Sequence, residues 1–225
     1  QEIYTGTADF VMRVLPHNFD DTWDLCLNIF PSLRSLSMHE QMEIYRSYHT
    51  DFTILDSFIC SWRVWGTFGD YFMFSRSMCL DLRKPDSWFA PNEGGANRDA
   101  LVSSMQMCSR EQMEVTVPSL KKAQLKDQEM HALFALLLCE IDLKPDASNR
   151  IVSLLDSIRH ETMRDLQRFY REEMGLANFS VRLGNLMTIC HALKECSLLF
   201  VKAFRMQVTL FDIWSTQTQL IELLL

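Results

Sequence analysis

The chain has 225 residues, of which 48% are hydrophobic, and its formal charge at neutral pH is -7. This apolar content, with 15 Phe and 5 Trp, is enough for a substantial core and excludes a disordered chain. The acidic balance and the lack of dense Lys/Arg clusters argue against direct nucleic-acid binding. No apolar run approaches the roughly 20 residues that span a bilayer, so we expect no membrane segment. We expect residues 1–225 to form one domain.

The cysteines are scattered, odd in number and without a CxxC spacing. His160-Glu161 looks like the start of an HExxH pattern, but Arg164 stands where the second histidine would have to be. We therefore predict reduced, mostly buried thiols rather than a disulfide framework or a zinc site. The cysteines are Cys26, Cys60, Cys79, Cys108, Cys139, Cys190 and Cys196.

The first helix that the sequence predicts ends at Phe30, because Pro31 disfavours helical geometry in the residue before it. Ser37 and Glu40 then have the spacing of a capping box, in which each side chain bonds the other residue's backbone N–H. This predicts a new helix from Ser37 to about Trp62.

The middle of the chain holds one β candidate and one long loop. The segment 70–82 has short aromatic and apolar runs that predict at most a two-stranded element. The Pro, Gly and Asn content of the following segment, 84–99, predicts a loop.

The second half reads as helices. The segment 126–140 reads as a helix that is apolar nearly all round from Leu133 to Cys139, as in a centrally buried helix. A long amphipathic helix follows from about 147 to 174, with Gly175 as its C-terminal stop, and another runs from about 179 to 206. Together these helices predict a layered all-α domain.

The last residues, "QLIELLL", are unusually apolar for a chain end. Burying each Leu or Ile is worth roughly 1.5–3 kcal/mol, so this turn is expected to dock. A glutamate in its middle has no part in such packing and suggests a second role.

Four stretches resemble one family in order and spacing. "IFPSLRSLSMHEQMEIYRSY" resembles the signature of nuclear receptor ligand-binding domains, and "LKDQEMHALFALLLCE" is similar to their buried eighth helix. "NFSVRLGNLMTICHAL" is similar to the start of their tenth helix, and "QLIELL" resembles their activation helix. The chain looks most similar to the divergent nematode receptors related to hepatocyte nuclear factor four.

This resemblance implies a three-layer antiparallel helical sandwich with a lipophilic pocket. It implies a domain of a nuclear transcription factor whose DNA contacts come from a zinc module, which we expect to be absent from this sequence. The activation helix would gate a groove for the LxxLL helix of a coactivator or for a corepressor peptide.

The groove residues can be carried over position by position. Glu222 matches the acid that holds one end of the partner helix, and Asn28 stands where the family has a lysine for the other end. Arg46 is a nearby cation that could replace the lysine, and Gln219 occupies an apolar position of the terminal motif. The implied groove comprises Asn28, Gln41, Met42, Tyr45, Arg46, Leu220, Glu222, Leu223 and Leu224.

The implied pocket differs from that of fatty-acid-binding relatives. Cys60 stands where those relatives carry an arginine for the ligand carboxylate, and Arg63 follows one turn later. Since a buried carboxylate without its cation is costly, a neutral lipophile is favoured over an acid. The resemblance implies a hydrophobic ligand for this pocket, such as a fatty acid, a sterol or another lipophilic compound. We expect no other cofactor in this domain. The implied lining comprises Cys26, Phe58, Ile59, Cys60, Trp62, Arg63, Met113, Cys196 and Phe200.

Two further expectations follow from the resemblance. The face of the helix 179–206 matches the family's surface for homo- or heterodimers, although the same stripe could be core. Glu129 and Arg182 stand where the family often has an ion pair between helices, the alternative being two unrelated surface charges.

Two other functions remain open. The domain could be an orphan receptor whose pocket is filled by its own side chains and which binds partners constitutively, or an all-α scaffold unrelated to transcription. The sequence shows no nucleophile–base–acid set or phosphate-binding loop, so we do not expect an enzyme.

Overall fold

The structure, a computed structural model, describes residues 4–7, 19–75, 78–89, 95–143 and 147–211. Within these ranges the chain is mainly helical, which confirms the predicted class. The α-helices are α2 (Phe19–Ile29), α3 (Met38–Trp65), α4 (Arg98–Glu111), α5 (Val117–Ala123), α6 (Asp127–Leu138), α7 (Asn149–Arg168) and α8 (Ser180–Phe211). The shorter segments are the 3₁₀ turns η2 (Pro31–Ser35), η3 (Pro85–Trp88) and η4 (Gly95–Asn97), and the π-helical turns η5 (Gln112–Thr116) and η6 (Phe169–Glu173).

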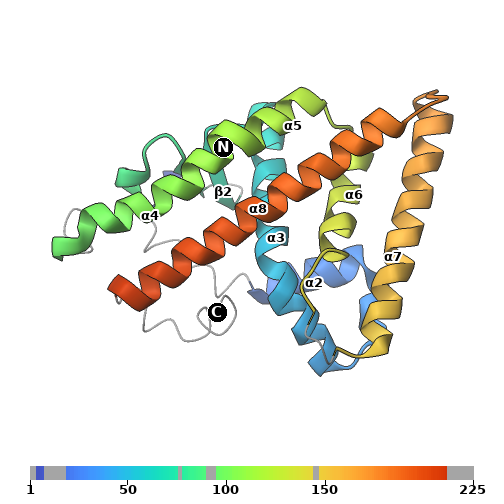
Figure 1. The fold of residues 1–225 in the computed structure, drawn as a ribbon, viewed down its shortest axis with the longest axis horizontal. Helices are drawn as coiled ribbons and strands as arrows, with labels where there is room; N and C mark the ends of the chain where they lie inside the picture. The colour runs from blue at the N-terminus through green and yellow to red at the C-terminus, as the bar shows by residue number, and fades with distance from the viewer. Residues whose placement is uncertain (1–3, 8–18, 76–77, 90–94, 144–146, 212–225) are drawn as a thin grey trace.

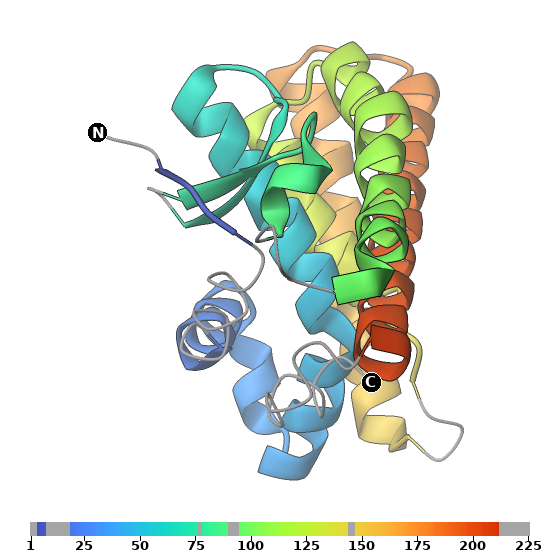
Figure 2. The same cartoon turned by 90° about the vertical axis from the view of Figure 1, so that its left-hand side faces the viewer.

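The helices are stacked in layers. Helices α4 and α5 run side by side with α8 and in the opposite direction (Figure 1). Seen from the side, α3 lies between this layer and a second one that holds α2 and the sheet (Figure 2). Helix α6 packs against α3, α7 and α8. This arrangement agrees with the predicted helical sandwich.

Helix α6 forms the centre of the core. Every residue from Leu133 to Cys139 is buried, so the helix has no solvent-facing stripe in this stretch. The Tyr48 hydroxyl on α3 donates to the Phe134 carbonyl over 2.7 Å, which satisfies a buried phenol. The prediction of a centrally buried helix is confirmed.

The sheet has the strand order β1-β3-β2. Strands β2 (Tyr71–Ser75) and β3 (Met78–Asp81) form the expected two-stranded element and are antiparallel. Strand β1 (Tyr4–Thr5) pairs in parallel with β3 as a third strand, so the prediction of at most two strands is wrong. The backbone N–H of Met73 donates to the buried Ser57 hydroxyl on α3 over 2.8 Å, which attaches the sheet to the central layer.

The long helix that begins at Asn149 ends as expected. After the π-helical turn η6, Gly175 has a φ of 66°, a left-handed conformation that favours glycine. The Leu176 N–H then bonds back to the Tyr170 carbonyl over 2.8 Å, which closes the last turn.

Candidate functional site

The connection between α2 and α3 is held by apolar side chains. The Phe30 N–H bonds the Cys26 carbonyl over 2.8 Å and closes α2, and Pro31 opens the 3₁₀ turn η2. Phe30, Leu33 and Leu36 are all buried in the core. These buried side chains therefore hold the exposed residues of the turn in fixed positions.

Helix α3 begins with the predicted capping box. The Ser37 N–H donates to Glu40 Oε2 over 2.8 Å, and the Glu40 N–H donates to Ser37 Oγ over 3.3 Å. Glu40 Oε1 also accepts the hydroxyl of Ser148, the N-cap of α7, over 2.6 Å. The Ser148 hydroxyl and the N–H and hydroxyl of Ser37 together lower the pKa of Glu40 to about 2. One carboxylate thus joins the starts of two helices.

The groove residues predicted on α3 take different positions. Arg46 is exposed and Met42 is half-buried, so both are available on the surface. Gln41 uses its amide to bond the Leu36 carbonyl over 2.9 Å. Tyr45 is buried, and its ring lies 4.8 Å from that of Trp23 on α2. Gln41 and Tyr45 thus support the surface that Met42 and Arg46 form.

On α2 the predicted residue Asn28 is exposed in the last turn. Its Oδ1 accepts a hydrogen bond from Arg34 Nη2 over 2.7 Å. Leu25 and Ile29 are 45% and 40% exposed and share the helix face of Asn28, since their spacing is i, i+3 and i+4. Sequence reasoning missed Leu25, Ile29 and Arg34. The available signal for Leu25 and Ile29 was their i, i+4 spacing, which places them on the helix face of the polar Asn28.

The acid side of the predicted groove is not placed. Leu220, Glu222, Leu223 and Leu224 lie outside the described residues. The described residues of the candidate site lie exposed or half-buried on α2, η2 and α3. They are Leu25, Asn28, Ile29, Arg34, Met42 and Arg46, and we call them the α2–α3 surface.

The predicted pocket residues fall into three groups. Four are buried in the core: Cys26, Phe58, Ile59 and Cys196. Four are half-buried, and three of these, Trp62, Met113 and Phe200, pack against the same core, while the fourth, Cys60, lies 3.7 Å from Asp56 Oδ2. Arg63 is exposed in the last turn of α3. Their role in ligand binding stays a prediction.

The cysteines are free thiols, as predicted. Burial raises the pKa of Cys26 and of Cys196 to about 12, because a thiolate would lose its water. Both are therefore protonated at neutral pH. Across the described ranges, no group of His, Cys, Asp and Glu side chains is arranged to hold a metal ion. Nor does any helix in those ranges have the length and apolar character needed to cross a membrane.

Of the two alternatives for Glu129 and Arg182, the structure has the ion pair between α6 and α8. Arg182 Nε donates to Glu129 Oε1 over 2.7 Å, and Arg182 Nη2 donates to Glu129 Oε2 over 2.5 Å. Tyr170 donates its hydroxyl to the same carboxylate over 2.9 Å, and so does the Lys126 N–H, over 2.8 Å. The Glu129 side chain is fully buried, so this pair is a structural joint rather than two surface charges.

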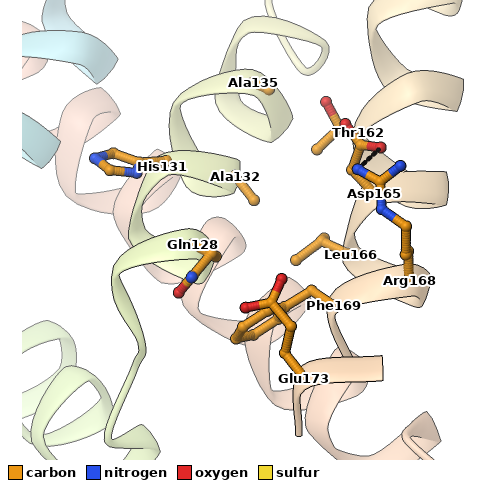
Figure 3. A pocket seen from close by; sticks show the side chains of 10 residues that line it. All are labelled: Gln128, His131, Ala132, Ala135, Thr162, Asp165, Leu166, Arg168, Phe169 and Glu173. Atoms are coloured by element: carbon orange, nitrogen blue, oxygen red, sulfur yellow. Dashed lines mark ion pairs between the residues drawn. The ribbon is translucent and has the colours of Figure 1, made fainter. Parts of the chain in front are cut away.

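Helices α6 and α7 and the turn η6 also line a hollow of about 260 Å³ (Figure 3). Ala132, Leu166 and Phe169 point into it, and Glu173 stands at its edge (Figure 3). The Arg168 guanidinium pairs with Asp165 over 3.1 Å. None of the residues predicted for the groove or the pocket lines this hollow.

The comparison with curated proteins gives no match. The comparison with family models does: residues 6–206 match the model described as the ligand-binding domain of nuclear hormone receptor. This range includes the α2–α3 surface, the capping box and the Glu129–Arg182 pair described above. Because the match spans most of the chain, the protein belongs to the family of nuclear hormone receptor ligand-binding domains.

Proposed function

We propose that the α2–α3 surface receives an amphipathic LxxLL-type helix from a coregulator of transcription. The observation that carries this proposal is the pair of exposed apolar side chains, Leu25 and Ile29, beside the exposed donors of Asn28 and Arg34. Leucines of a partner helix would cover the apolar side chains. The donors would bond the carbonyl groups that every helix leaves unpaired at its C-terminus.

The C-terminal segment would complete this site. Glu222 would bond the unpaired N–H groups at the other end of the partner helix, and the neighbouring leucines would dock on the domain. A ligand or a well-packed core would shift the population toward the docked position. We infer a neutral lipophilic ligand, because Cys60 brings no cation for an acid.

Three wider proposals follow from family membership. The full protein would be a nuclear transcription factor that contacts DNA through a separate zinc module, and its resemblance to nematode receptors supports a place in that subgroup. It would dimerise through α8, on which Val181, Met187 and Leu198 are exposed apolar side chains.

The proposed groove can be tested by titrating an LxxLL peptide against the domain and its Glu222→Ala variant, with fluorescence anisotropy as the readout. We expect roughly tenfold weaker binding, equivalent to about 1.4 kcal/mol, because one helix end loses its partner. Glu172→Ala, on the exposed surface of η6, is the matched control and should bind as the parent does. Equal binding by the parent and Glu222→Ala would remove Glu222 from the site.

A further inference from the structure

The end of α2 carries a paired donor group. Arg34 lies in η2, three residues after Pro31, and the 3₁₀ turn brings its guanidinium back to the last turn of α2. There Nη2 donates to Asn28 Oδ1 over 2.7 Å. Both side chains are exposed, and the described residues contain no ion pair of Arg34.

The pair presents mainly hydrogen-bond donors. An asparagine amide has one acceptor oxygen and two N–H donors, and a guanidinium has five N–H donors and no acceptor. Since Arg34 occupies the oxygen of Asn28, the amide hydrogens of Asn28 remain for other partners. The surface at this point therefore offers several N–H groups and a full positive charge.

This donor group stands at one end of an apolar strip. Leu25 and Ile29 are exposed on the helix face that also carries Asn28. A partner helix lying on this strip with its C-terminus toward Asn28 would direct its unpaired carbonyl groups at the donors. The negative end of its helix dipole would meet the guanidinium, and so would any acidic residue just after that end.

We propose that Arg34, held in place by Asn28, is the cation that binds the C-terminal end of the partner helix. Through this charge it selects partner helices that are followed by an acidic residue. This inference rests on the proposed function of the α2–α3 surface. It names the partner more narrowly, as an LxxLL-type helix followed by Asp or Glu.

Arg46 is the other cation of the surface. It is exposed on α3, and the described residues provide it with no hydrogen bond. Ordering a free arginine side chain on binding costs about 0.5–1.5 kcal/mol, whereas Arg34 is already held by Asn28. Arg34 is also tied to the end of α2 itself, which fixes the place of its charge relative to Leu25 and Ile29.

The test uses two LxxLL peptides that differ only in the residue after the helix, Glu in one and Lys in the other. Fluorescence anisotropy gives the affinity of each peptide for the parent domain and for Arg34→Ala, Asn28→Ala, Arg46→Ala and Glu222→Ala. We expect the parent to prefer the Glu peptide about fivefold, as for a charge at a helix end. This preference should shrink at high salt, because exposed charges are screened.

Arg34→Ala should abolish the preference and weaken the Glu peptide about fivefold, while Arg34→Lys keeps part of the preference because it keeps the charge. Asn28→Ala should reduce the preference as well, since the guanidinium loses its anchor. Arg46→Ala removes the other cation of the surface and should keep the preference, whatever it does to the affinity for both peptides. Thermal unfolding checks that these exposed substitutions leave the fold intact.

Two results would overturn the inference: a parent without any preference, or a preference that survives Arg34→Ala and disappears in Arg46→Ala. If Glu222→Ala still weakens both peptides in that case, the proposed groove stands and only the role of Arg34 falls. If neither peptide binds the parent, the groove and the inference fall together.

Discussion

At the scale of single residues, His49 is the most strongly perturbed base in the core. Its ring is buried on α3, with the ring of Tyr45 edge-on at 5.3 Å. Burial lowers its pKa from 6.5 to about 3, because the imidazolium would lose its hydration. Below pH 6.5 His49 becomes protonated in the unfolded chain, whereas in the folded protein it stays neutral until the pH falls to about 3. The folded state therefore loses stability as the pH falls through this window.

This dependence can be measured with urea unfolding at about pH 7 and about pH 5.5. We expect the parent to lose about 1.2 kcal/mol more than His49→Phe over this interval, because phenylalanine keeps a flat aromatic ring and cannot be protonated. Comparing the two proteins cancels the contribution of the carboxylates, which they share. The same pH dependence in both would show that His49 is not kept neutral by the fold.

At the scale of elements, two glycines occupy positions with different backbone conformations, one at the end of a helix and one inside a helix. Gly66 ends α3 with a φ of 68°, and its N–H bonds the Trp62 carbonyl over 2.7 Å. Gly184 lies in the interior of α8, on its exposed side. A Cβ added at either position would meet nothing within 4 Å. The effect of adding one is therefore set by backbone geometry alone.

The same substitution at both sites should change stability in opposite directions. Gly66→Ala is expected to lower the free energy of unfolding by about 1 kcal/mol, because alanine disfavours the left-handed region. Gly184→Ala should raise it by about 0.5–1 kcal/mol, because glycine is a poor residue in a helix interior. Chemical denaturation of the two variants beside the parent gives both values. A gain for Gly66→Ala would contradict the account of the α3 terminus, and a loss for Gly184→Ala would contradict that of the α8 interior.

At the scale of the whole molecule, two buried ion pairs join the layers through α8. Glu129 and Arg182 connect α6 to α8, and Tyr170 brings η6 into the same cluster. Further along α8, Lys194 Nζ lies 2.7 Å from Asp51 Oδ2 on α3. Burial raises the pKa of Asp51, against the effect of the lysine. The long helix is thereby connected to both of the helices at the centre.

Breaking the first of these pairs should be costly. Arg182→Ala leaves the buried Glu129 carboxylate without its cation, and we expect a loss of about 3 kcal/mol in the free energy of unfolding. Arg168→Ala removes an arginine from the exposed pair with Asp165 and should change stability by no more than about 0.5 kcal/mol. Urea denaturation distinguishes the two outcomes. Similar small losses in both variants would mean that Glu129 gains water or another partner when Arg182 is absent.

Local sequence signals predicted the elements that depend on neighbouring residues. The capping box at Ser37 and Glu40 and the all-round apolar pattern of 133–139 are properties of adjacent positions. Strand β1 could not be predicted, because two residues at Tyr4 and Thr5 form a strand only by pairing with Met78 and Cys79, far along the chain. Such pairing is set by the tertiary fold rather than by local preference.

The residues of the candidate site also fall into those that the sequence could predict and those that only the tertiary fold brings together. The resemblance placed Asn28 and Arg46 on the surface that the structure describes, because a family motif fixes their order. It could not find Arg34, whose side chain reaches Asn28 only because η2 is a tight 3₁₀ turn. Nor could it separate Tyr45, which lies under the surface against Trp23, from Met42, which forms part of it.

The carboxylate of Glu40 has a consequence for how the molecule opens. It completes the cap of α3 and also bonds Ser148 at the start of α7, 108 positions further along the chain. Near the same place Arg150 donates to the Ser35 carbonyl. Local unfolding of either helix start removes contacts that hold the other. We therefore expect the beginnings of α3 and α7 to open together, so that loosening α7 also loosens the edge of the α2–α3 surface.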